Sequence, residues 1–355
     1  MSFFNNNLNA FGLDLSDRSI KVAQLKKNGE KISLYSYGRE NIPEGLIVDG
    51  EIKNEEEAAK FIKKTLLRAK PNPIKSKLVI YSIPEPKGFI RVVKISHSQK
   101  DDIEQAIKYE AEQLFPVDIN ESYLDWQIIS SENDKINVIV AVVPKPLVDS
   151  YSSVMAMAGL KPIAAEIESI AITRSLIKEN QSSRPILIID LGRDRTSFII
   201  FKNPAVQFTA SIPICGEEFT KAISENLGIS KGKAEKMKEK CGLTFEGECR
   251  NVFKAIQPSL YEMIKYINKL TYYYKDHFKL NEDIVKVMIC GGEAKMSGMS
   301  SFLSLQIKKE IEKGNPWVNI ITQKNKETPL ISRDSSLVFV TVLGLALRGI
   351  KDVIE

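Results

Sequence analysis

Two stretches of the chain repeat one pattern at a fixed distance. The first reads FGLDLSDRSIKVAQLKK, from Phe11 to Lys27, and the second reads LIIDLGRDRTSFIIFKN, from Leu187 to Asn203. A shift of 176 positions (190 − 14) superposes them without a gap. In each stretch an apolar run ends in an aspartate, a short polar turn follows, and a second apolar-rich run begins. The pattern predicts two strand–turn–strand units, each with a carboxylate at the mouth of its turn.

The two aspartates, Asp14 and Asp190, are the leading candidates for a binding site. Hairpins that face each other across a cleft offer main-chain N–H groups to phosphate. Their carboxylates suit Mg²⁺, which prefers oxygen ligands. Gly192 fits such a turn because a glycine lets the backbone approach a ligand closely. The alternative is that each aspartate only caps its own turn, as aspartates often do.

Composition narrows the class of protein. The chain has 355 residues, of which 43% are hydrophobic and 27% charged, as in a globular protein of several subdomains. Its net charge of +5 is spread thinly, without a Lys/Arg block or a basic aromatic stripe. No nucleic-acid partner is therefore expected.

The cysteines argue against a zinc site and for a reducing compartment. They have no CxxC spacing, and four scattered thiols in a long chain are typical of a cytoplasmic protein. The chain start lacks a secretory signal pattern, and the longest apolar run, 337–347, is too short to span a bilayer. The cysteines are Cys215, Cys241, Cys249 and Cys290, and the two histidines, His97 and His277, are assigned no role.

Apolar periodicity predicts alternating strands and helices. Asn54 is expected to cap a helix that ends before Pro71, and residues 159–162 are expected to form a turn. Strands are expected at 11–15, 20–26, 31–37, 78–83, 89–95, 123–130, 136–143 and 285–289, with three more within 186–213. Further helices are expected at 100–114, 145–158, 217–226, 231–240, 251–278 and 335–350.

Two weaker signals add to the candidate site. Gly291 and Gly292 follow a buried strand directly, and such a turn can pack against an adenine or ribose. Glu235 and Lys238 lie three apart on one helix face and are suited to a ribose or base edge. For this pair the sequence alone favours a solvated ion pair.

These elements in this order resemble the actin-like ATPase superfamily, which includes actin, sugar kinases, the Hsp70 nucleotide domain and FtsA. The resemblance is closer to the PilM family of type IV pilus assembly proteins. It runs through nearly the whole chain, and its most specific part is IKYEAEQLFPVDINESYLDWQ at 107–127. Other matching segments are AMAGLKPIAAEIESIAITRSL at 156–176, CGEEFTKAISENLGISKGKAEKMK from Cys215 and GGEAKMSGMSSFL from Gly291.

The resemblance implies an α/β, actin-like fold of duplicated βββαβα lobes of the ribonuclease H type, with a small α+β domain inserted in the first lobe. The first lobe would comprise residues 1–83, joined by 160–185 and the C-terminal segment 335–355. The inserted domain, of the FtsA type, would span 84–159. The second lobe would span 186–334, with a helical subdomain at about 228–282.

It also implies ATP and Mg²⁺ between the lobes, with Asp14 and Asp190 reaching the metal through water. Glu168 is the candidate catalytic residue that positions water, and the alternative is an exposed glutamate at a helix start. The expected nucleotide contacts are Asp14, Ser16, Ser19, Asp190, Gly192, Thr196, Gly216, Glu235, Lys238, Gly291, Gly292 and Met296.

Two departures from the superfamily pattern bear on turnover. Ser16 and Cys215 stand where glycines are usual, and a Cβ at either position crowds the phosphate tail. Two alternatives therefore remain: an active ATPase, and a protein with slow or absent hydrolysis in which ATP is a structural ligand that holds the lobes together.

The family's partner is PilN, an inner-membrane protein whose short cytoplasmic N-terminal peptide lies in a groove involving the small domain. The resemblance thus implies a cytoplasmic platform protein, peripheral to the inner membrane through its partner, with contacts to other pilus platform proteins and a possible homo-oligomer. Helix 101–115 is the groove candidate. One alternative is an FtsA-like membrane-associated filament scaffold, which would need a C-terminal amphipathic helix, whereas the helix before Glu355 is apolar. The other is a small-molecule kinase, which would need an aspartate as catalytic base, and no candidate for that base is found.

Overall fold

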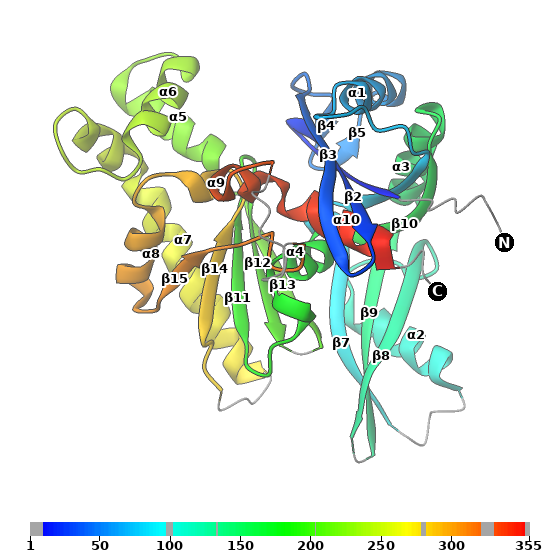
Figure 1. The fold of residues 1–355 in the computed structure, drawn as a ribbon. Coiled ribbons are helices and arrows are strands. Elements are labelled where there is room, and N and C mark those ends of the chain that lie inside the picture. The colour runs from blue at the N-terminus through cyan, green and yellow to red at the C-terminus, as the bar shows by residue number, and fades with distance from the viewer. Residues whose placement is uncertain are drawn as a thin grey trace.

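The computed structural model describes residues 10–96, 102–132, 134–202, 204–277, 282–320 and 330–351. His97, the predicted helix start at Lys100 and the predicted helix end at Phe278 lie outside these residues. Two five-stranded sheets stand side by side, and a three-stranded sheet extends below the first (Figure 1).

The first sheet has the strand order β10-β6-β1-β2-β3. Strands β1, β2 and β3 form the expected antiparallel meander. Strand β6 pairs with β1 in parallel, and β10 pairs with β6 in parallel. The strands are β1 (Phe11–Ser16), β2 (Ser19–Asn28), β3 (Lys31–Asn41), β6 (Leu78–Ile83) and β10 (Lys161–Ile167). The turn predicted at 159–162 is wrong in its second half, because Lys161 and Pro162 pair with β6 as strand residues.

The second sheet repeats this topology. Its order, read from the opposite edge, is β15-β14-β11-β12-β13, with the same antiparallel meander and the same two parallel neighbours. The strands are β11 (Ile186–Leu191), β12 (Thr196–Lys202), β13 (Ala205–Ile212), β14 (Lys286–Cys290) and β15 (Ile311–Lys313). The prediction of a duplicated fold is confirmed by the match of the two sheets.

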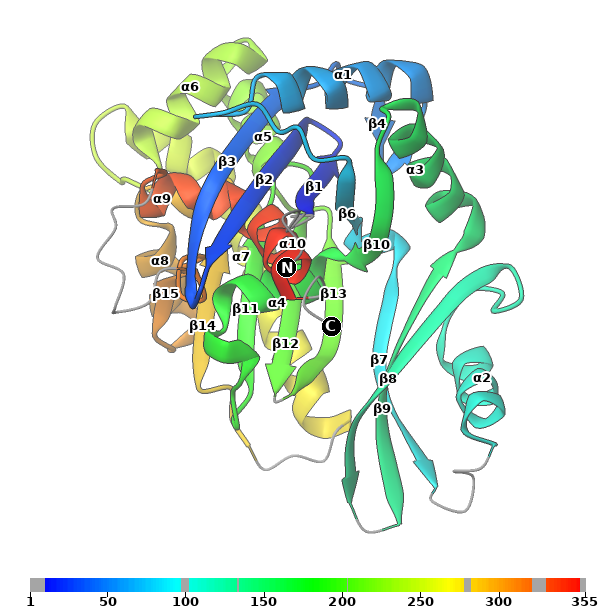
Figure 2. The ribbon, with the colours of Figure 1, turned by 45° about the vertical axis from the view of Figure 1, so that its right-hand side comes forward.

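Between β6 and β10 in sequence lies the third sheet, of order β7-β9-β8 (Figure 2). One of its faces packs on helix α2 through buried Val138, Val140 and Ile107. The elements are β7 (Phe89–Ser96), α2 (Ile103–Leu114), β8 (Ser122–Glu132) and β9 (Lys135–Pro144). This unit falls within the predicted inserted domain 84–159, whose bounds stay a prediction.

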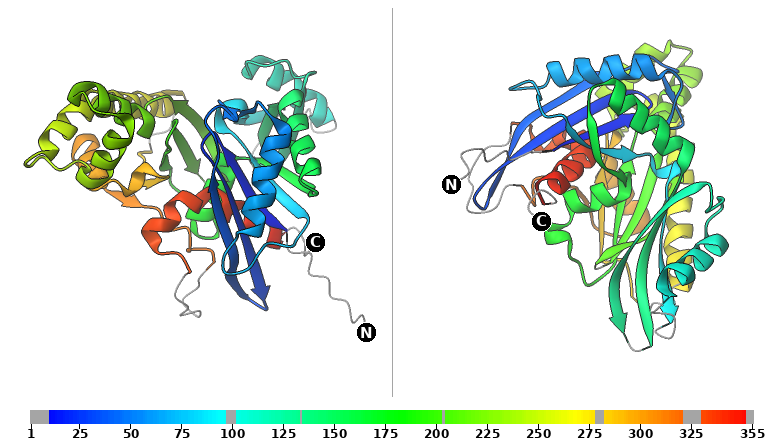
Figure 3. Two further views of the ribbon diagram at one scale, coloured as in Figure 1. Left: turned by 90° about the horizontal axis from the view of Figure 1, so that it is seen from above. Right: turned by 90° about the vertical axis from the view of Figure 1, so that its right-hand side faces the viewer.

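Helices cover the sheets and join them. Asn54 caps α1 as expected, since its side chain accepts from the Glu57 N–H at 3.0 Å. Helices α4 and α10 pack together between the sheets (Figures 1 and 3), and α10 contributes buried Val342, Leu343 and Leu345. The helices are α1 (Glu55–Leu67), α3 (Lys145–Met157), α4 (Glu168–Leu176), α5 (Gly216–Leu227), α6 (Lys231–Cys241), α7 (Cys249–His277), α8 (Met299–Ile307) and α10 (Val340–Lys351).

The helix predicted at 335–350 is not continuous. It consists of α9 (Arg333–Ser336), a 3₁₀ turn (Leu337–Phe339) and α10. The apolar pattern is the same throughout, so the sequence does not reveal the break. A short hairpin of β4 (Ile47–Val48) and β5 (Glu51–Ile52) was not predicted, because two-residue strands carry almost no periodicity.

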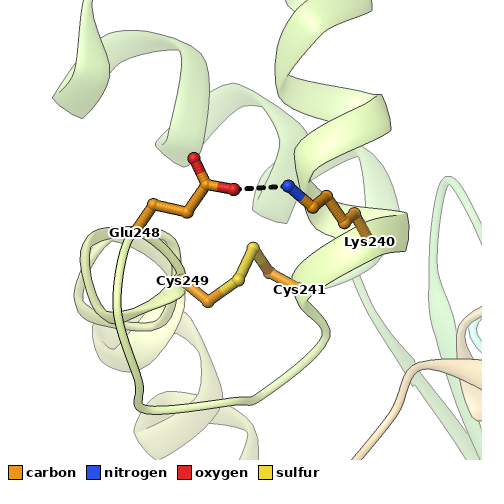
Figure 4. The surroundings of a disulfide bond; sticks show 4 residues. All are labelled: Lys240, Cys241, Glu248 and Cys249. Atoms are coloured by element: carbon orange, nitrogen blue, oxygen red, sulfur yellow. Dashed lines mark hydrogen bonds and ion pairs between the residues drawn. A yellow bond between two sulfur atoms is a disulfide. The ribbon is translucent and has the colours of Figure 1, made fainter.

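The prediction of four free thiols is wrong. Cys241 and Cys249 form a disulfide (Figure 4). Cys215 and Cys290 are free and buried. The spacing of eight residues matches no motif, but the turn between α6 and α7 brings the last residue of one helix to the first of the other.

Candidate functional site

The first hairpin places a cation opposite its aspartate. In the register of β1 and β2, Asp14 pairs with Lys21, and the Lys21 Nζ lies 2.7 Å from the Asp14 Oδ2. The other carboxylate oxygen, Oδ1, accepts from the Ser82 hydroxyl at 2.9 Å. Asp14 is 3% exposed. Both oxygens of this buried carboxylate therefore have a partner, as burial of a charge requires.

The second hairpin has the same register without the cation. Asp190 pairs with Ser197, which is the counterpart of Lys21. A side-chain donor to Asp190 is the thiol of buried Cys290, at 3.7 Å from Oδ1. Burial, the largest cause, raises the pKa of Asp190 to about 6; Lys21 lowers it and the Asp14 charge raises it further. A carboxylate in this state gains from a nearby cation.

The tips of the two hairpins face each other. Arg18 Nε lies 3.2 Å from Asp194 Oδ1, and the Arg195 guanidinium lies 3.5 Å from Asp17 Oδ2. These two ion pairs cross from one lobe to the other, and all four side chains are largely buried in the lining of one cleft. The two acidic turns thus converge on one crevice.

Glu168 lies in the same cleft at the start of α4, as predicted, and it is half-buried rather than exposed. Its Oε2 accepts from the Glu85 N–H at 3.0 Å, and the Glu85 Oε2 accepts from the Ser169 N–H at 3.0 Å. Burial, followed by the charge of Asp14, raises the pKa of Glu168 to about 8. This rise brings the pKa of Glu168 into the range suited to proton transfer near neutral pH.

Gly291 closes the cleft beside Asp190. Its φ is +88°, and a Cβ there would lie 2.4 Å from the Asp190 Oδ1 and 2.5 Å from the Leu191 carbonyl oxygen. No side chain fits at this position, and the left-handed φ also favours glycine. The glycine lets the segment after β14 lie directly against the second aspartate.

Most of the predicted nucleotide-contact residues line this one cleft. They are Asp14, Ser16, Ser19, Asp190, Gly192, Gly291 and Gly292, together with Glu168. The Ser16 hydroxyl donates to the Ser19 carbonyl oxygen at 3.0 Å, so it folds back over its own turn. The Gly192 N–H donates to the Arg195 carbonyl oxygen at 3.0 Å, so a phosphate would compete with a bond inside the turn.

The other predicted contacts lie outside the lining of the cleft. The hydroxyl of buried Thr196 donates to the Ile214 carbonyl oxygen at 2.6 Å. Met296 ends the 3₁₀ turn after Gly292 and is 8% exposed. Gly216 begins α5, and Cys215 before it is 4% exposed. For these residues the nucleotide roles stay predictions.

Glu235 and Lys238 are not the solvated pair that the sequence favoured. Lys238 is 2% exposed, and its Nζ donates to the Gly216 carbonyl oxygen at 2.9 Å. The same Nζ lies 3.1 Å from Glu293 Oε1 and 3.2 Å from Glu235 Oε2. The spacing correctly predicts one helix face but does not reveal that α5 and the segment after Gly292 cover it.

Several charged residues of the cleft were not predicted. They are Asp17, Arg18, Lys21, Arg39, Arg193, Asp194 and Arg195. Lys21 was within reach of sequence reasoning, because a tight turn centred on Asp17 and Arg18 pairs Asp14 with the residue seven positions later. The crossed ion pairs were not, since they depend on how the lobes face each other.

The donor set fits a magnesium–nucleotide better than a bare metal. Among the described residues no cluster of three or more His, Cys, Asp or Glu side chains is arranged to hold a metal ion. Two carboxylates on opposite sides of the cleft, of which Asp190 has no cation paired across its hairpin, suit a hydrated Mg²⁺ that is bound mainly by phosphate.

A profile of the family described as "Type IV pilus assembly protein PilM" matches residues 12–350. The chain belongs to the PilM family. This assignment confirms the resemblance drawn from the sequence.

Solved structures agree on the fold of this PilM-family chain. A structure of the PilM-PilN type IV pilus biogenesis complex superposes with a TM-score of 0.80 at 23% identity, covering 96% of this chain and 98% of that one. MreB5 of Spiroplasma citri bound to AMPPNP superposes with a TM-score of 0.58 at 13% identity, covering 97% of both chains.

Among curated proteins, the cell division protein FtsA of Bacillus subtilis is 21% identical over 267 residues, 69% of this chain and 60% of that protein. FtsA of Streptococcus pneumoniae is 26% identical, over 64% of this chain and 54% of that protein. The chain thus spans little more than half the length of these relatives. No helix in the described part of the chain is long and apolar enough to cross a membrane.

Proposed function

We propose that this chain binds ATP with Mg²⁺ between its two acidic hairpins and docks the cytoplasmic N-terminal peptide of PilN at the inner-membrane platform for type IV pili. The residues 84–159 would serve as the docking domain. The chain would be held at the membrane through this partner.

One observation carries the nucleotide part. Asp14 and Asp190, at matching positions of two repeats, line one cleft with Lys21 beside them. Arg18 and Arg195 stand at the tips and would exchange their carboxylate partners in the opposite lobe for phosphate oxygens. Bound Mg²⁺ would neutralise phosphate charge, and Asp14 and Asp190 would hold it through water. Glu168 would position a water molecule or share its proton, and ATP would act chiefly as a structural ligand.

Calorimetry with ATP and Mg²⁺ tests this part. Asp190→Ala should weaken binding at least tenfold, which corresponds to about 1.4 kcal/mol. The matched control is Asp149→Asn, on the exposed side of α3, where Tyr123 donates to the carboxylate at 2.9 Å. Equal affinity in wild type and Asp190→Ala would remove the cleft assignment.

A second groove supports the docking part. It lies between the three-stranded sheet and the elements α4 and β13, and its lining includes Asp125 and Gln127 of β8 and Ala141 of β9. Its lining also holds an ion pair, in which the Arg174 guanidinium donates to the two carboxylate oxygens of Glu166 at 2.5 and 2.6 Å. The structurally similar PilM is solved in a complex with PilN, and an extended peptide of this kind suits a groove along an edge strand.

The groove lies on the sheet face opposite α2. Alternation along β9 sends Val138, Val140 and Val142 toward α2, and Ile139 and Ala141 toward the groove. We therefore propose this face for the peptide in place of helix 101–115.

Fluorescence anisotropy with a labelled PilN N-terminal peptide tests the site. Ala141→Arg fills the groove and should weaken binding more than tenfold, whereas Tyr109→Ala, at a 63% exposed position of α2, should not change it. The reverse result would return the docking site to α2. Self-association into sedimenting filaments without peptide binding would favour the FtsA-like scaffold.

A further inference from the structure

The disulfide joins two helices beside the proposed nucleotide site. Cys241 ends α6 and is 1% exposed, whereas Cys249 begins α7 and is half-buried (Figure 4). Of the residues between the two cysteines, 244–248 are exposed. Of the two bonded residues, Cys249 is therefore the one that lies closer to the surface.

The turn closed by this disulfide packs on the segment that follows Gly292. The Leu243 N–H donates to the Ser297 carbonyl oxygen at 2.8 Å. Gly242 has a φ of +56°, and a Cβ on it would lie 2.5 Å from the same oxygen. Ser297 follows Met296, a predicted nucleotide contact, so the disulfide turn packs directly on the loop that carries this residue.

At the other end of the disulfide, Cys241 is the last residue of α6. Lys238 lies one turn before Cys241 and binds both the Gly216 carbonyl oxygen and Glu293. Helix α6 therefore connects the disulfide to the start of α5 and to the loop after β14. These are two borders of the region assigned to the nucleotide.

One ion pair spans the same gap as the disulfide. It joins Lys240 to Glu248 (Figure 4). Its side chains are 69% and 63% exposed, and exposed pairs contribute little and are screened by salt. Loss of the disulfide would therefore leave the turn to depend mainly on its packing against Ser297.

We propose that Cys241 and Cys249 form a site of reversible oxidation that sets the rigidity of the adenosine side of the cleft. This proposal rests on the proposed nucleotide function. A disulfide in a protein of a reducing compartment is usually transient and redox-sensing, which suits a bond with one half-buried cysteine next to an exposed turn.

The chemistry is thiol–disulfide exchange with a small thiol of the glutathione class. Its thiolate attacks the Cys249 Sγ, the bond between the two protein sulfurs breaks, and Cys241 leaves as a thiolate that takes up a proton. A second thiol then attacks the mixed disulfide and releases Cys249, which also takes up a proton. Two small thiols are oxidised to one small disulfide, and two electrons reduce the protein.

The experiment compares the full chain after equilibration with glutathione disulfide or with reduced glutathione. Thiol counting with a maleimide after denaturation should give two thiols in the oxidised form, Cys215 and Cys290, and four in the reduced form. Without nucleotide, hydrogen exchange should be at least threefold slower in the oxidised form across 231–249 and 296–299. Calorimetry should give ATP with Mg²⁺ at least threefold tighter binding to the oxidised form.

Two variants serve as controls. Cys249→Ser, at the half-buried position, should show the hydrogen exchange and the nucleotide affinity of the reduced form under both conditions. Glu248→Gln breaks only the ion pair and should keep the full redox response.

Four free thiols after equilibration with glutathione disulfide, or identical hydrogen exchange in both forms, would overturn the proposal. Redox-dependent exchange without nucleotide binding in either form would support the oxidation site and overturn the proposed function. Redox-dependent exchange with equal nucleotide affinity would overturn the link to the cleft.

Discussion

The two hairpins have the same strand register, but the side chains that contact their aspartates differ. In the first, Lys21 and Ser82 occupy both oxygens of Asp14. In the second, the corresponding positions hold Ser197 and Cys290, and the pKa of Asp190 rises to about 6. The same backbone therefore carries one carboxylate paired with a cation and one that gains from an added cation. A duplicated fold does not imply a duplicated site.

Lys21→Met should have the largest effect, because it removes the cation from a carboxylate that is 3% exposed. Breaking a buried ion pair on one side costs about 3 kcal/mol. Urea unfolding at pH 7 measures this loss. The matched change in the second hairpin, Ser197→Ala, removes only a hydroxyl contact to Ser211 at 2.8 Å and should cost about 1 kcal/mol. Equal losses would mean that the hairpins do not differ electrostatically.

Glu168→Gln should stabilise the nucleotide-free protein in a pH-dependent manner. The folded pKa of Glu168, about 8, lies above the ordinary value of 4.5, so burial penalises the charged form. The penalty is absent below pH 4.5, grows as the pH rises, and is complete above pH 8. We expect a gain of about 2 kcal/mol at pH 9 and none at pH 4, allowing for partial exposure.

Thermal unfolding across this range measures the effect. A gain of the same size at pH 4 and pH 9 would assign it to packing instead of charge. Glu225→Gln, at an α5 position that does not line the cleft, is the matched control and should show no pH-dependent gain.

Asp194→Asn should weaken one of the two ion pairs between the hairpin tips. Because both partners are about a quarter exposed, the cost in stability should be below about 1 kcal/mol and should shrink in high salt. The freed Arg18 should bind phosphate better, so ATP affinity should rise about threefold. Glu44→Gln removes the 73% exposed partner of Arg18 within its own lobe and should leave the affinity unchanged. Weaker binding in Asp194→Asn would show that this carboxylate serves the nucleotide.

Cys290→Ser should have the smallest effect and make the second hairpin more like the first. A hydroxyl donates more strongly to a carboxylate than a thiol does, so the pKa of Asp190 should fall from about 6 toward its ordinary value. Carboxyl NMR titration measures the shift, with a stability change below about 1 kcal/mol. An unchanged pKa would mean that burial and the charges of Lys21 and Asp14 determine it without a contribution from Cys290.

Prediction from sequence succeeded where structure is local. Strand β6 has the predicted bounds, Asn54 caps its helix, and the repeat predicts both hairpins and their aspartates. Alternation, capping and turn chemistry act within a few residues, so they are visible in the chain itself. The same logic extends to Lys21, which a consistent use of hairpin register would have found.

The amino-acid sequence by itself determined that two equivalent acidic turns exist, and it carries the match to the PilM family over residues 12–350. Only the tertiary structure decided that Arg18 meets Asp194, that Lys238 is buried, that Cys241 bonds Cys249, and that the groove lies opposite α2. The physical reason is distance along the chain. Periodicity specifies which face of an element is apolar, but which element covers that face depends on the packing of the lobes as a whole.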